Sequence, residues 1–224
     1  RLAGESLDGA GHRPRAQELW RRALEDWAVL LSTTTSPSGR AHALVERGRL
    51  LHHLGRIVEA RASFDEAVDA DPEQPAVYAE VIAFLLLRGH LDAALDAYHR
   101  ALGRPQVTDY IKTYTSLWVI DFARARGLTT DPLATEHLAS RHGRQWYDDV
   151  ARYKTGASTF PELLAKANTR GKRAEAFFYG AMDRFANHDV KGAEDFLRRV
   201  VATDMLGFFE YDMAVFFLAH GPPK

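Results

Sequence analysis

Small and aromatic residues recur along this chain at helical spacing and divide it into short amphipathic segments. Residues 56–72 read RIVEARASFDEAVDADP, which places Ala60, Phe64 and Ala67 on one face of a helix. Pro72 cannot continue that helix, so the pattern predicts an end just before it. Gly55 precedes the segment and predicts a tight turn after an earlier helix.

The same pattern returns 34 residues later in the chain. At this shift Gly55 corresponds to Gly89, Ala60 to Ala94, Phe64 to Tyr98 and Ala67 to Ala101. A fixed period of about 20 to 50 residues is typical of stacked supersecondary units. The sequence therefore predicts repeated pairs of antiparallel helices.

Each recurring residue type has a physical reason in such a pair. Alanines at 60 and 94 remove bulk where two helix backbones approach, and the aromatic residues at 64 and 98 fill the space between units. Glycines at 55 and 89 allow the positive φ that a tight turn requires. We therefore expect the alanines to face neighbouring helices rather than solvent.

This pattern resembles the tetratricopeptide repeat family. The first unit, residues 41–74, carries signature residues at Gly48, Leu51, Ala60, Phe64, Ala67 and Pro72. The second, residues 75–108, carries them at Tyr78, Leu85, Ala94, Tyr98 and Ala101, and departs from the family at Val81, Ile82 and Pro105. The resemblance implies an all-α fold, a right-handed superhelical solenoid of antiparallel helix pairs, and a function in binding other proteins.

The remaining segments extend this pattern into a single predicted array over residues 1–224. Residues 1–31 form a partial repeat, in which Ala16, Trp20 and Ala23 have the spacing of a second helix, and 32–40 form a loop rich in Ser, Thr, Pro and Gly. The next segments are a degenerate helix pair (109–143), irregular short helices (144–173), another repeat (174–206) and a capping helix (207–221).

The capping helix is unusually apolar. It contains Phe208, Phe209, Phe216 and Phe217, whereas the end of a repeat array normally shows a polar outer face. Two outcomes stay open: the helix seals an interface with a second copy of the chain, or it folds back onto the core.

The C-terminal third also resembles NlpI-like bacterial lipoproteins, which are repeat proteins of the cell envelope. The similarity is carried by Trp146, residues 177–180 (FFYG), Ala193 and residues 210–211 (EY). It implies an adaptor on the periplasmic side of a bacterial cell envelope, with or without a lipid anchor. A cytoplasmic location stays open as well.

Composition narrows the function further. Hydrophobic residues make up 46% of the 224 residues and charged residues 26%, as expected of a packed fold. The formal net charge is −1, which predicts no attraction to nucleic acid. The chain has no cysteine, and no apolar run reaches the roughly 20 residues that would insert directly into a membrane.

The sequence predicts no catalytic, cofactor-binding or metal site, and therefore no enzyme. The adjacent His52 and His53 point in different directions on a helix, and His137 and His142 are five residues apart, so neither pair suits one metal ion. The rival hypothesis places a site near residues 144–168, either of an enzyme or of a non-catalytic part of an enzyme complex. A pocket lined by residues 146–149 (WYDD) with strongly shifted carboxylate pKa values would support it.

The concave surface of the array is the predicted binding site, because solenoids expose it for extended or helical partners. By family register, the groove residues are His42, Val45, Arg49, His52, His53, Ala79, Ala83, Leu86, Leu87, Phe178, Met182 and Phe185. The partner is a protein or peptide. In the alternatives, the apolar part packs on a helix of the same chain, or helix 207–221 forms a homodimer. A clamp for a C-terminal carboxylate is not expected, since the two asparagines, Asn168 and Asn187, lie outside the required positions.

Overall fold

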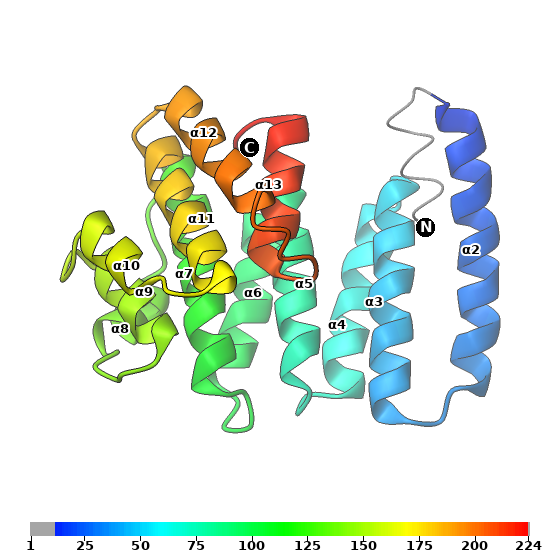
Figure 1. The fold of residues 1–224 in the computed structure, drawn as a ribbon. Helices are drawn as coiled ribbons and strands as arrows, with labels where there is room; N and C mark the ends of the chain where they lie inside the picture. Colours follow the sequence, from blue (N-terminus) through cyan, green and yellow to red (C-terminus); the bar gives the residue numbers. More distant parts are fainter. Residues whose placement is uncertain (1–11, 224) are drawn as a thin grey trace. The chain divides into compact units, whose positions relative to one another are not determined.

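The computed structural model describes residues 12–223, where helices are the only regular secondary structure (Figure 1). Twelve helices account for 75% of these described residues, which contain no strand, so the predicted all-α fold class is confirmed. The first eleven residues of the partial repeat predicted over residues 1–31 lie outside the described residues. The helices are α2 (Arg13–Thr33), α3 (Pro37–His53), α4 (Ile57–Ala70), α5 (Pro75–Leu87), α6 (Leu91–Leu102), α7 (Asp109–Ala125), α8 (Pro132–Ala139), α9 (Trp146–Lys154), α10 (Phe160–Lys166), α11 (Arg170–Ala186), α12 (Val190–Val201) and α13 (Phe209–His220).

The chain divides into two compact units. Unit 1 consists of residues 1–81 and 103–107, and unit 2 of residues 82–102 and 108–224. The boundary falls within α5, which contributes its first half to unit 1 and its second half to unit 2. The handedness and continuity of one array over both units stay predictions.

The α3–α4 pair in unit 1 has the predicted packing. Ala60 and Ala67 are buried, and the Phe64 ring lies directly against Gly48 of α3. A Cβ atom at Gly48 would come within 2.5 Å of Phe64 Cε1, so only glycine permits this approach. The Ser63 hydroxyl donates a hydrogen bond of 3.0 Å to the Leu44 carbonyl, which joins the two helices at the same level.

The glycine turns are confirmed at both repeats. Gly55 has φ 77° and Gly89 has φ 80°, the left-handed conformation expected after a helix end. In unit 2 the residues equivalent to Ala60 and Phe64, Ala94 and Tyr98, are fully buried. Alanine therefore faces a neighbouring helix in both repeats.

The connection between α2 and α3 is shorter than the loop predicted over residues 32–40. Helix α2 continues to Thr33, where the hydroxyls of Ser32 and Thr33 bond to carbonyls one turn earlier. Helix α3 already begins at Pro37, because the Ser36 side chain accepts a hydrogen bond from the Gly39 N–H and Pro suits a first helical position. The Ser-Pro stretch is therefore a helix start.

Unit 2 is built around the long helices α7 and α11, which pack against each other (Figure 1). The C-terminal helix α13 packs against α11 and α12 and contacts α7 through aromatic side chains. The short helices α9 and α10 cover another side of α11. Helices α11 and α12 form a pair in which Gly180 lies against the Phe160 and Phe196 rings, a close approach of glycine and aromatic rings like that at Gly48. This arrangement determines which surfaces of unit 2 remain accessible.

Candidate functional site

Helix α13 is held by one apolar face. Glu210, Met213, Ala214 and Phe217 are buried, at the spacing of successive helical turns. Val215 on the opposite side is 45% exposed. One face of the helix is therefore buried and the opposite face is exposed, although the sequence is apolar on nearly all sides.

Aromatic rings fix α13 on α7 and α11. The ring centroids of Phe209 and Trp118 are 5.1 Å apart, and Phe217 lies 5.5 Å from Phe122 and 5.8 Å from Phe185. Such tilted or edge-on contacts are the favoured arrangements of aromatic pairs. Of the two outcomes that the sequence left open for this helix, the structure shows packing onto the core of its own unit.

A buried carboxylate anchors the start of α13. Glu210 Oε1 accepts a hydrogen bond of 3.0 Å from Trp118 Nε1 and one of 2.9 Å from the Tyr179 hydroxyl. Burial raises the pKa of Glu210 above its ordinary value, although these hydrogen bonds favour the charged form. The contact joins α13 to both α7 and α11.

A second buried carboxylate lies close to the first. Glu175 Oε2 accepts hydrogen bonds from the Tyr114 hydroxyl and, at 2.9 Å, from Trp146 Nε1. Burial, followed by the charge of Glu210, raises the pKa of Glu175 to about 8. Each carboxylate thus has one indole and one phenol donor, and neither set of donors carries a charge.

Lys154 forms the centre of a further buried polar network in unit 2. Its ammonium group, inaccessible to solvent, lies 2.5 Å from Asp121 Oδ1 and also contacts Asp183. Burial raises the pKa of Asp121 to about 6, although the charge of Lys154 lowers it. Lys154 and Asp121 lie within the packed core, so this network stabilises the contact of α7, α9 and α11.

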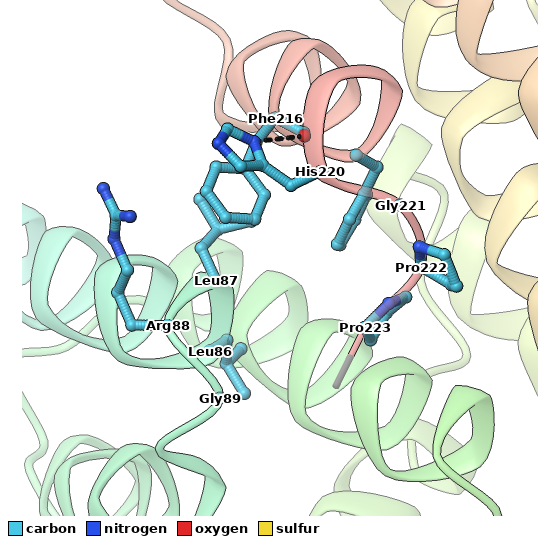
Figure 2. Close-up of a pocket in the computed structure, with 10 residues that line it drawn as sticks. Leu86, Leu87, Arg88, Gly89, Phe216, His220, Gly221, Pro222 and Pro223 are labelled. Atoms are coloured by element: carbon cyan, nitrogen blue, oxygen red, sulfur yellow. Dashed lines mark hydrogen bonds between the residues drawn. The ribbon is translucent and has the colours of Figure 1, made fainter. Parts of the chain in front are cut away.

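An open cavity lies at the other end of α13. Its volume is about 200 Å³, and its walls come from the end of α5, the last turn of α13 and the residues that follow (Figure 2). Leu86 and Phe217 are buried in these walls, whereas His220 and Pro222 at the edge are exposed. The cavity therefore opens to solvent.

Stacked side chains border this cavity. The Arg88 guanidinium lies 5.4 Å from the Phe84 ring centroid and 5.3 Å from that of Phe216. On Phe216 the His220 imidazole stacks at 4.3 Å, and His220 Nδ1 lies 3.0 Å from the Phe216 carbonyl oxygen (Figure 2). The cavity thus combines apolar walls with two basic side chains.

Most of the predicted groove residues lie in the core. Seven of the twelve are buried and cannot contact a partner in this conformation: Val45, Ala79, Ala83, Leu86, Phe178, Met182 and Phe185. Sequence register assigned them to an open face, but other helices cover them. Five remain at least partly accessible: His42, Arg49, His52, His53 and Leu87.

In unit 2, α13 covers part of the predicted groove. Phe185 contacts Phe217, and Leu86 and Leu87 line the cavity beside Phe216 and Phe217. This is the alternative in which the apolar part of the groove packs on a helix of the same chain. Only the end near Leu87 stays open.

In unit 1 the histidines of α3 contact tryptophans of α2. The His53 ring stacks on Trp20 at 4.7 Å, and His42 meets the edge of Trp27 at 5.9 Å. Arg49 is ion-paired with Glu46 at 2.5 Å and with Glu80 at 3.5 Å. These side chains therefore take part in packing within unit 1.

The carboxylates proposed for a site near residues 144–168 have structural partners. Asp148 is fully buried and accepts hydrogen bonds of 2.9 Å from Arg141 Nε and from the Gln145 N–H at the start of α9. Burial would raise the pKa of Asp149, but hydrogen bonds from Lys166 and Arg152 lower it. The raised pKa values that would favour an enzyme are not found at Asp149.

Sequence reasoning missed the role of Glu175 and Glu210. The sequence signal for a buried Glu210 was the presence of a glutamate within a strongly apolar helix. Its tryptophan and tyrosine donors are 92 and 31 residues away along the chain, so the pairing itself depends on the tertiary fold.

Comparison with known families supports the repeat assignment for part of the chain. Residues 1–75 match the family model of the tetratricopeptide repeat. The tetratricopeptide match includes the α3–α4 pair and covers 75 of the 224 residues, about a third. No curated protein matches the chain, and the resemblance to NlpI-like lipoproteins has no support from these comparisons. Among the described residues, no helix is both long and apolar enough to span a membrane.

Proposed function

We propose that this chain is a non-catalytic module that binds other proteins. The tetratricopeptide match supports the class, since such repeats generally mediate contacts between proteins. The observation that carries the proposal is the cavity at the end of α13, where Leu87 and His220 remain accessible beside buried apolar walls. A solvent-open apolar cavity with a few polar groups is the usual form of a recognition site.

Binding at this end leaves α13 in place. The helix supplies Phe216 and Phe217 to the cavity while its buried face holds α7 and α11. Self-association through the apolar face of α13 is less well supported, because Met213, Ala214 and Phe217 are already buried within unit 2. The proposed role is therefore an adaptor that engages a short segment of a partner.

Affinity capture from a lysate of the organism that encodes the chain tests this proposal. Wild type should be compared with Leu87→Glu, which places a charge at the cavity, and with Val58→Glu, which makes the same kind of change at an 84% exposed site of α4. We expect a protein that wild type and Val58→Glu retain and Leu87→Glu loses. Circular dichroism melts confirm that both variants fold.

Two results would count against the proposal. If wild type retains nothing beyond a blank resin, the binding function is wrong. If Leu87→Glu retains the same proteins as wild type, the cavity is not where they bind.

A further inference from the structure

We propose that the cavity beside α13 binds a partner segment in which one apolar side chain is adjacent to Asp or Glu. The inference rests on the proposed protein-binding function and adds the chemistry of the occupant. It follows from the size of the cavity, the nature of its walls and the charge of the side chains around it.

The size of the cavity limits the occupant to one side chain. Pockets for drug-sized ligands have volumes of about 300 to 1,000 Å³, whereas an apolar cavity of about 150 Å³ accommodates benzene. At about 200 Å³, this cavity fits a single side chain of the size of leucine or phenylalanine. A whole helix does not enter it.

The walls select an apolar group. Leu86 and Phe217 are buried at the inner side, and Pro222 and Pro223 form the side opposite Leu87 and Phe216 (Figure 2). Proline has no N–H to offer, so this side provides no backbone donor. An inserted hydrogen-bond acceptor would therefore lose its bonds to water without gaining a backbone donor from these two prolines.

The charge around the cavity favours an acidic neighbour. Arg88 and His220 are the ionisable residues among those that line it, and the described lining contains no Asp or Glu. The Arg88 guanidinium lies over the Phe84 and Phe216 rings. A guanidinium has five N–H donors and can serve several acceptors, and a carboxylate matches its planar geometry.

His220 is the second basic residue at the edge of the cavity. Its Nδ1 is engaged with the Phe216 carbonyl, which leaves Nε2 on the outer side of an exposed ring. The imidazolium form donates from both nitrogens, so Nε2–H is available to an acidic group. Arg88 and His220 both contact the Phe216 ring, so the edge beside an inserted side chain presents two basic groups to an acidic neighbour.

A segment of a polypeptide suits this site better than a free small acid. The cavity opens between exposed residues, so the inserted side chain fills it while the chain that carries it continues along the rim. The walls hold the apolar group, and the basic side chains at the edge contact the neighbouring residue. A free acid is a separate outcome of the test.

Short synthetic peptides provide the test on the full chain. The probe is an acetylated, amidated hexapeptide, Gly-Ser-Leu-Glu-Ser-Gly, compared with versions that carry Gln for Glu or Ala for Leu. Binding is followed by the methyl resonances of Leu86 and Leu87 and the imidazole resonances of His220. We expect the Leu-Glu peptide to shift these signals and both altered peptides to bind about tenfold more weakly.

Variants assign the effect to the cavity. Arg88→Gln and His220→Gln should each lower the affinity for the Leu-Glu peptide about tenfold. Neither variant should change the lower affinity for the Leu-Gln peptide. Arg144→Gln, which removes an exposed arginine of unit 2 outside the cavity, is the matched control and should bind as wild type does.

The inference is overturned by any of three results. The first is that the resonances do not shift at about 1 mM Leu-Glu peptide. The second is that the Leu-Gln peptide binds as tightly as the Leu-Glu peptide, and the third is that free 4-methylpentanoate does so. If whole proteins are still captured in a manner that depends on Leu87, the inference fails while the proposed function stands.

Discussion

At the residue scale, the core of unit 2 holds a pair of buried glutamates whose side-chain hydrogen-bond donors, among the described residues, are all uncharged. Glu175 accepts hydrogen bonds from Tyr114 and Trp146, and Glu210 accepts them from Trp118 and Tyr179. After burial, the charge of Glu210 is the next largest cause that raises the pKa of Glu175. Uncharged donors stabilise a carboxylate less than a guanidinium does. The raised pKa values therefore follow from burial that hydrogen bonding only partly offsets.

The titration of Glu175 predicts a specific dependence of stability on pH. Its pKa in the folded protein is about 8, above the ordinary 4.5, so the folded state retains a proton that the unfolded chain releases. This contribution to the free energy of unfolding is fully present below about pH 4.5 and is lost as the pH rises through about 8. We expect Glu175→Gln to flatten the fall in Tm between about pH 5 and pH 8.

The matched control for that prediction is Glu136→Gln, which changes an exposed carboxylate of α8. Thermal melts of the control should follow the wild-type profile at every pH. If Glu175→Gln also follows the wild-type profile, Glu175 does not titrate in the way that its environment indicates.

Gly48 offers a second test at a single residue. Alanine favours a helix over glycine by about 1 kcal/mol, yet its Cβ would lie 2.5 Å from Phe64 Cε1. We expect Gly48→Ala to destabilise the protein by about 1 to 3 kcal/mol in urea unfolding, because the ring has to move. In a Phe64→Leu background the penalty should shrink, and an unchanged penalty would contradict the contact.

Lys154 offers a third test at a single residue. Lys154→Met removes the cation from the buried Asp121 and should cost about 3 to 5 kcal/mol of stability. The double change Lys154→Met and Asp121→Leu should recover most of this loss, because Asp183 keeps Tyr153 and Arg124 as partners. Lys166→Met, at a 53% exposed side chain, should change the urea midpoint little.

At the element scale, the sequence could predict helices wherever residue spacing alone determines them. Ala60, Phe64 and Gly55 have local signatures, and each lies where the repeat pattern indicates. The start of α3 could not be separated from a loop by composition, because Ser36 and Pro37 are typical of both a turn and a helix start. Only the hydrogen bond from Gly39 to Ser36 distinguishes them.

The candidate site was predictable only in part. Leu86, Leu87 and Phe185 do lie on surfaces that face another helix, but the helix that faces them is α13, more than a hundred residues from Leu87. Helical periodicity shows which side of a helix is apolar and does not show what covers it. The apolar excess of residues 207–221 indicated burial, and the tertiary fold decided between a partner and the chain's own core.

The attachment of α13 predicts how a local change spreads. Phe217→Ala removes ring contacts to both Phe122 and Phe185 and should cost about 3 to 5 kcal/mol. In hydrogen exchange, α13 should lose protection first, followed by the segments of α7 and α11 beneath it. Val215→Ala, at a 45% exposed position of the same helix, should leave exchange nearly unchanged.

At the scale of the whole molecule, the sequence predicted the fold class and one continuous array, and the structure adds the division into two units. The repeat period is the same for each helix pair, so it does not show where contacts between neighbouring helices become sparse. The same Phe217→Ala exchange experiment extends to this scale. Unit 1 should keep its wild-type exchange, and equal loss in α3 and α4 would show that the two units unfold together.

The division of α5 between the units has a consequence for how such a protein can be rearranged. Segment boundaries that evolution or an engineer can exploit normally fall in exposed linkers, but here one falls between Val81 and Ile82, within a continuous helix. Residues 103–107 then return to unit 1, so unit 1 is not one uninterrupted stretch of polypeptide. Duplicating, deleting or transplanting a part of the chain is therefore expected to succeed at the turn between repeats, at residues 71–74, rather than at the boundary itself.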